Sequence, residues 1–140
     1  MKIIKESSAF LSNYEVLQLL KEGKSQQSKS VANLATVTYE TVAYLEQTAC
    51  ALQTDENVEA FLEQISALPF KLTKVEKLQL INHRPTTAVE IQLLIEESEE
   101  RLSEDDVQTI LDVVQRTLPA PVEEAEDDAE VVEDDAMQCE

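Results

Sequence analysis

The sequence has very little glycine or proline: one glycine, Gly23, and four prolines among 140 residues. Strand-and-turn architectures use glycine often, because it adopts positive φ at turns without a steric cost. The phosphate-binding loops G-x-G-x-x-G and G-x-x-x-x-G-K each need more than one glycine, so neither is present. The shortage of glycine therefore favours helices and excludes the common nucleotide-binding loops.

Cysteine and long apolar runs are scarce too. Cys50 and Cys139 are the only cysteines, which makes a disulfide framework improbable and a reducing compartment the expected one. No apolar run approaches the roughly 20 residues that span a bilayer. The opening residues MKIIKESSAF lack the apolar core of a secretory signal. We expect a cytosolic or nuclear protein.

Positive charge is also limited, with 11 basic residues against 29 acidic ones and a formal net charge of −18. Residues 119–140 contain ten of the acidic residues, no lysine or arginine and no aromatic residue, and this composition predicts a disordered acidic tail. Hydrophobic residues make up 43% of the chain, enough for one globular domain, which we place at 1–118. The acidic body disfavours tight binding to duplex nucleic acid.

Helix start signals recur along this domain. A Ser or Thr followed three residues later by Glu or Asp has the spacing of a capping box, in which each side chain bonds the other residue's backbone N–H. The pattern, together with Thr54 before a helix-period apolar stripe, predicts about six helices in a compact orthogonal all-α bundle. The boxes are Ser12–Glu15, Thr73–Glu76, Thr87–Glu90 and Ser103–Asp106.

Helix ends are marked as well. Pro85 disfavours the α conformation at the residue before it and so predicts a helix end near Asn82, after which the next helix is expected to run from Thr87 to Leu102. Gly23 suits a left-handed position just past the first helix, and residues 24–32 are predicted to form a flexible linker.

The helix after this linker is the least certain in type. Asn33 is its expected cap, and its core face is expected to carry Leu34, Val37, Thr41 and Leu45. The segment is rich in Val and Thr, whose branched side chains weaken helix propensity, so a strand is the alternative.

Candidates for catalysis are few. His83, the only histidine, has no Ser or Cys nucleophile paired with it in a known pattern, and a helix C-terminus is a favourable place for it. Cys50 follows an alanine and is expected to be a small core or interface residue rather than a nucleophile. The acidic clusters at 96–100 and 104–106 are expected to be solvated rather than metal-binding. We expect no enzyme activity, cofactor or metal.

Two segments are candidates for binding. Lys71, Lys74 and Lys77 are three residues apart and, with Arg84, form the one local excess of positive charge, suited to an acidic partner or to RNA. The alternative is a solvated face that balances nearby carboxylates. The N-terminal segment is more apolar than a free chain end requires. It either packs on its own helices or binds a partner, and its candidate residues are Ile3, Ile4, Phe10, Leu11 and Tyr14.

The segment KLTKVEKLQLINHRPTTAVEIQLLIEESEERL at 71–102 closely resembles the signature of a known family, and AFLSNYEVLQLL at 9–20 and TYETVAYL at 38–45 match it in the same order. The family is the small stalk subunit of RNA polymerase III, also called the calcitonin-gene-related-peptide receptor component protein family. The resemblance implies a fold similar to the helicase-and-RNase-D C-terminal (HRDC) domain. It also implies a nuclear, non-catalytic subunit.

The same resemblance implies particular partners. Family members pair with a larger subunit that carries an oligonucleotide-binding barrel, through a surface that includes the N-terminal segment. The resulting stalk acts with initiation factors in transcription of small structured RNAs such as tRNA and 5S rRNA. Two alternatives remain, an adaptor in peptide-hormone receptor signalling and a free-standing nucleic-acid-binding module. The sequence offers no transmembrane helix, lipidation motif or basic amphipathic face for the first of these.

Overall fold

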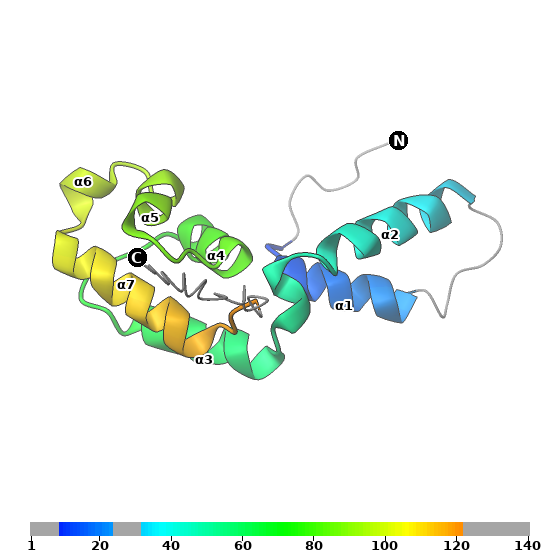
Figure 1. Ribbon diagram of the computed structural model, residues 1–140, viewed down its shortest axis with the longest axis horizontal. Coiled ribbons are helices and arrows are strands. Elements are labelled where there is room, and N and C mark those ends of the chain that lie inside the picture. Colours follow the sequence, from blue (N-terminus) through cyan, green and yellow to red (C-terminus); the bar gives the residue numbers. More distant parts are fainter. Residues whose placement is uncertain (1–8, 24–31, 122–140) are drawn as a thin grey trace, which may run out of the picture.

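The computed structural model describes residues 9–23 and 32–121. Within these ranges the chain is helical and contains no strand, which confirms the all-α prediction (Figure 1). The helices, in chain order, are α1 (Asn13–Gly23), α2 (Ala32–Leu45), the 3₁₀-helix η1 (Ala49–Leu52), α3 (Asp55–Ser66), α4 (Lys74–His83), α5 (Ala88–Leu94), α6 (Ser98–Arg101) and α7 (Glu104–Thr117).

Two groups of helices lie end to end in the elongated molecule (Figure 1). The helices α1 and α2 form an antiparallel hairpin at one end, and α3 to α7 form a bundle at the other. In this bundle α7 runs back along α3, and the side-chain amide of Asn57 donates a 3.0 Å hydrogen bond to the carbonyl of Thr117, where the two helices meet. Helices α4 and α5 cover the same core from the other side.

The bundle core consists of side chains from four helices. Fully buried residues are Phe61 on α3, Leu80 on α4, Ile91 on α5, and Ile110 and Val114 on α7. On α7 the buried side chains recur at helical spacing along most of its length: Val107, Ile110, Leu111, Val113, Val114 and Thr117. Burying side chains of this size stabilises a fold by about 1.5–3 kcal/mol each relative to leaving them exposed.

Hydrogen bonds join the hairpin to the bundle at the C-terminal end of α4. The backbone N–H of Asn13 donates to the side-chain carbonyl of Asn82 at 2.9 Å. Just beyond, the side-chain amide of Gln53 donates to the carbonyl of Ile81 at 3.0 Å. The end of α4, which Pro85 helps to set, therefore fixes where the hairpin attaches.

The predicted caps are present. All four boxes, at Ser12, Thr73, Thr87 and Ser103, have both of their hydrogen bonds. Thr54 also caps α3, where Asn57 takes the place of an acidic residue. Helix α4 ends at His83, and the next residue adopts a left-handed conformation at φ 45°, which agrees with the predicted break before Pro85.

Three predictions about helix limits were wrong. Gly23 is the last residue of α1 and has no positive φ, and α2 begins at Ala32, so Asn33 lies within it. The helix expected from Thr87 to Leu102 is divided in two, because the backbone leaves the helical conformation at Ile95 and turns left-handed at Glu97 with φ 52°. The predicted linker (24–32) and the predicted tail (119–140) lie mostly outside the described residues.

The predicted inner face of α2 was right at Leu45 and wrong at Leu34 and Val37. Its buried residues are Thr38, Val42 and Leu45, whereas Leu34 and Val37 are 52% and 59% exposed. Helix α2 packs against α1 and η1, so only the side of α2 that faces them is covered. Its other apolar side chains reach the surface.

Candidate partner-binding surfaces

Two of the five N-terminal candidates, Ile3 and Ile4, lie outside the described residues. Phe10 and Leu11 are 61% and 44% exposed, just before α1 begins. Tyr14, by contrast, is buried in the core. Burial of the Tyr14 phenol, together with its hydrogen bond to the Asp55 carboxylate, raises its pKa. Phe10 and Leu11 are therefore available to a partner, whereas Tyr14 attaches α1 to the start of α3.

The lysine candidates are brought to the same place as Phe10. Lys74 and Lys77 on α4 line a groove of about 370 Å³ together with Phe10 and with Val58 and Leu62 of α3. The ammonium of Lys77 donates to the hydroxyl of Ser66 at 3.0 Å across the groove. Phe10 and the lysines of α4, which are about 60 residues apart in the sequence, thus line one apolar groove with a cationic rim. Neither the N-terminal segment nor the lysine spacing predicted this groove by itself.

Arg84 does not belong to this cationic surface, contrary to the sequence prediction. It is 9% exposed, and its Nε donates a 3.2 Å hydrogen bond to the carbonyl of Leu118. The left-handed backbone at Arg84 turns the chain toward buried Pro85 and the end of α7. Arg84 therefore holds α4 to α7 and offers little charge to a ligand. Lys71 is exposed but does not line the groove.

The helical hairpin carries several exposed apolar side chains that the sequence pattern did not predict to be exposed. We call the exposed set on α1 and α2 the hairpin face, and each of its members is more than half exposed. Its members are Leu19, Leu34, Val37, Tyr39 and Tyr44. The apolar residues of α2 are spread around the helix, so the sequence shows no clear apolar face. Only the packing of α1 against α2 shows which side of α2 remains exposed. Isolated exposed apolar residues are ordinary, but five of them, each more than half exposed, on one pair of helices make the hairpin a candidate binding surface.

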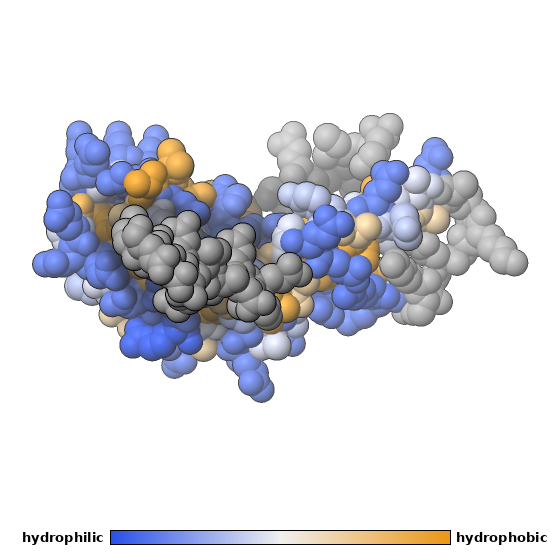
Figure 2. Space-filling view, viewed as in Figure 1, coloured by the Kyte–Doolittle hydropathy of each residue, from blue (hydrophilic) through white to orange (hydrophobic). Residues whose placement is uncertain are grey.

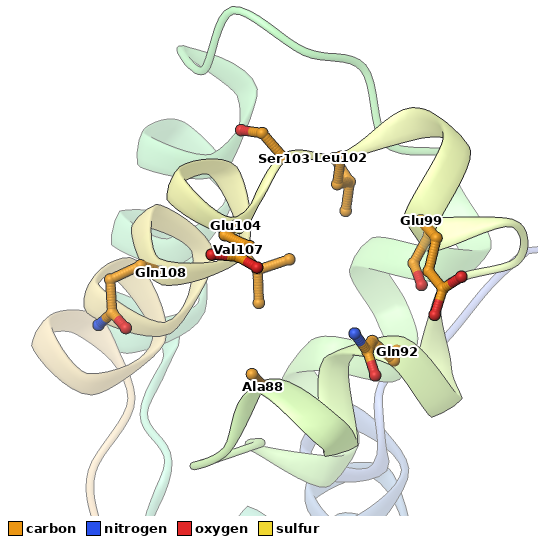
Figure 3. Close-up of a pocket in the computed structure, with 9 residues that line it drawn as sticks. Ala88, Gln92, Glu99, Leu102, Ser103, Glu104, Val107 and Gln108 are labelled. Atoms are coloured by element: carbon orange, nitrogen blue, oxygen red, sulfur yellow. The ribbon is translucent and has the colours of Figure 1, made fainter.

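A second groove lies at the far end of the bundle, between α5, α6 and α7 (Figure 3). It has a volume of about 540 Å³, and Ala88, Leu102 and Val107 supply its apolar surface. Glu99 and Glu104 stand on opposite sides of it, with the Gln92 side chain between them (Figure 3). Where grey atoms do not cover it, the surface of this half of the molecule is largely hydrophilic, with a marked hydrophobic spot near α5 (Figure 2).

The remaining candidates for chemistry are separated from one another. His83 is exposed at the end of α4, and Cys50 is fully buried, with its Sγ 3.3 Å from the carbonyl of Leu45. Residues 9–23 and 32–121 hold no group of three or more His, Cys, Asp or Glu arranged to bind a metal ion. Over the same ranges, no helix has the length and apolar character needed to cross a membrane.

The main ion pair of the bundle was not predicted. Glu76 is buried, and its carboxylate accepts from the Nη1 and Nη2 of Arg101. Hydrogen bonding to Arg101 lowers the pKa of the Glu76 carboxyl, and its bonds to Thr73 act in the same direction. The two residues are 25 positions apart, so no local spacing rule could have found the pair. This pair is structural and ties α6 to the start of α4.

The class of protein defined by these features is a small, acidic, all-helical protein that carries exposed apolar and charged surfaces. A family model for RNA polymerase Rpb4 matches residues 10–118, most of the chain. The chain belongs to this family of polymerase subunits.

Individual relatives support the same family. The chain is 32% identical over 132 residues to DNA-directed RNA polymerase III subunit rpc9 of Schizosaccharomyces pombe, covering 85% of this chain and 100% of that protein. The protein of the same name from Dictyostelium discoideum is 33% identical over 112 residues, covering 76% and 85%. The RPC9 subunit of Saccharomyces cerevisiae is 24% identical over 159 residues, covering 81% and 98%.

Proposed function

We propose that the chain is a non-catalytic subunit of nuclear RNA polymerase III. The single observation that carries this proposal is the match, over nearly their whole length, to relatives that are named as subunits of that enzyme. The work of the proposed subunit is to hold and present other proteins.

The partner we propose is the larger stalk subunit, which carries an oligonucleotide-binding barrel. The heterodimer would act with initiation factors when tRNA and 5S rRNA genes are transcribed. Phe10, Leu11 and the hairpin face support a protein partner, because these apolar side chains remain between 44% and 69% exposed. Burial of apolar area of this kind drives association. Ile3 and Ile4 are proposed to extend the same contact.

The test is a double substitution, Phe10→Asp with Leu11→Asp, in the chain co-expressed with the larger subunit. We expect heterodimer affinity to fall by at least about tenfold, as for loss of apolar anchor residues, with helicity by circular dichroism unchanged. Leu93→Asp is the matched control, since Leu93 is 81% exposed on α5, away from this surface. Unchanged co-purification of the double variant would remove the N-terminal contact from the proposal.

Membership of the polymerase is tested separately. The tagged full chain is purified from nuclear extract, and the catalytic subunits of polymerase III are sought by mass spectrometry. Their absence, with signalling receptors captured in their place, would favour the adaptor alternative.

A further inference from the structure

We propose that the groove between α5, α6 and α7 binds a segment of a partner protein that carries a lysine or arginine beside an apolar side chain. This surface lies in the bundle, whereas the contact with the larger subunit is assigned to the hairpin and the residues before it. The inference therefore goes beyond the proposed heterodimer and does not depend on it.

The shape and lining of the groove suit a side chain with an apolar stem and a charged end. Leu102 and Val107 supply apolar surface beneath carboxylates from two different elements, Glu99 on α6 and Glu104 at the start of α7 (Figure 3). A lysine or arginine places its methylene groups on apolar surface and keeps its charge at a polar rim. The two carboxylates flank the position that such a charge would take.

An unpartnered hydroxyl in the groove is the second, independent indication of a ligand. Ser98 is only 7% exposed and lines the groove, and its hydroxyl makes no hydrogen bond within the described residues. Among these residues the buried side-chain atom without a partner is Gln53 Oε1, so the Ser98 oxygen is not sealed off and remains open to a ligand in the groove. A bound peptide amide or ammonium would satisfy this hydroxyl. The left-handed turn at Glu97 is what places Ser98 there.

No lysine or arginine among the described residues lines the groove. Between residues 85 and 115 the sequence holds nine acidic residues and one basic residue, Arg101. Arg101 is already occupied by Glu76 and by the carbonyl oxygens of Glu96 and Lys71. An acidic segment or a nucleic-acid phosphate would be repelled, so the complementary occupant is a cationic peptide.

The probe is a capped peptide of sequence Gly-Leu-Lys-Leu-Lys-Gly, titrated into the ¹⁵N-labelled full chain and followed by amide chemical shifts. We expect saturable shifts centred on Gln92, Ser98 and Val107. The same peptide with glutamine in place of both lysines should produce none at equal concentration. Shifts confined to other parts of the chain would overturn the proposal. Self-association of the chain through this groove, measured by sedimentation, would also overturn it, because the occupant would then be a second copy of the chain.

Two double variants, one inside the groove and one outside it, distinguish specific peptide binding in the groove from general attraction of a cationic peptide to an acidic protein. Glu99→Gln with Glu104→Gln should weaken peptide binding about tenfold, and Ser98→Ala should weaken it about threefold. Glu59→Gln with Glu63→Gln, which removes two exposed carboxylates of α3 outside the groove, should leave the affinity unchanged. Equal weakening by the two double variants would overturn the proposal, since binding would then follow net charge alone.

Discussion

At the scale of single residues, Glu76 has two structural roles at once. Its carboxylate accepts from the backbone N–H of Thr73 at 2.8 Å, which completes the cap of α4, and it also pairs with Arg101. Arg101 in turn donates to the backbone carbonyls of Lys71 and Glu96. One carboxylate thus joins the start of α4, the loop before it and α6. By comparison, Glu90 caps α5 in the same way but is exposed and has no cationic partner within the part of the chain that the structure describes.

We expect Glu76→Gln to lower the free energy of unfolding by about 2 kcal/mol at neutral pH, because it removes one member of a largely buried ion pair. Glu90→Gln is the matched control and should cost about 0.5–1 kcal/mol, the value of a capping contact alone. Urea denaturation of both variants gives the comparison. Equal losses would mean that the Arg101 pair adds nothing to the cap.

The same pair predicts how stability varies with pH. The pKa of the Glu76 carboxyl is lowered in the folded chain, chiefly by Arg101, so the unfolded chain binds a proton more readily. Its contribution is therefore complete above the unfolded value of about 4.3 and is lost as pH falls through the lower, folded value. The stability difference between wild type and Glu76→Gln should be constant near neutrality and shrink toward pH 3. A difference that stays constant down to that pH would contradict this linkage.

At the scale of helices, the break between α5 and α6 is set by a residue that is poorly suited to its conformation. Glu97 has φ 52°, a left-handed conformation that costs a side-chain-bearing residue about 1–2 kcal/mol. Glycine carries no such penalty. The break is nevertheless what separates α5 from α6 and positions the groove lined by Ser98.

Glu97→Gly should therefore raise the free energy of unfolding by about 0.5–1 kcal/mol, after the greater freedom of glycine in the unfolded chain is counted. Glu100→Gly, at an exposed position within α6, should instead lower it by about 1 kcal/mol. Thermal unfolding by calorimetry distinguishes the two signs. Destabilisation by both glycines would show that the left-handed turn carries no strain.

The helices also show what local sequence can predict. Caps and the proline break depend on neighbours within four residues, so every box was placed correctly from the sequence. The α2 face was misassigned because Val37 and Val42 are equally apolar, and only the position of α1 decides which is covered. The Glu76–Arg101 pair and the joining of Phe10 with Lys74 in one groove depend on tertiary packing. No spacing rule contains that information.

At the scale of the whole molecule, the candidate surfaces differ in both location and charge. Phe10, Lys74 and Lys77 form an apolar groove with a cationic rim beside the hairpin. The groove between α5, α6 and α7 is acidic and lies at the other end of the bundle. With this layout, the proposed contact with the larger subunit and the proposed peptide contact in the groove would not compete for the same surface.

The last prediction concerns whether the chain binds RNA through Lys71, Lys74 and Lys77. The chain has a formal charge of −18, and phosphate neutralisation supplies most non-specific affinity, so we expect the isolated full chain to bind single-stranded RNA with a Kd weaker than about 10⁻⁴ M at physiological salt. Fluorescence anisotropy with a labelled oligonucleotide measures this. Replacing Lys71, Lys74 and Lys77 with glutamine should then change nothing in the RNA titration. If instead the wild-type chain bound in the micromolar range, with an affinity that fell steeply with salt and disappeared in the triple variant, the lysines would be an RNA-binding surface rather than a contact for an acidic protein.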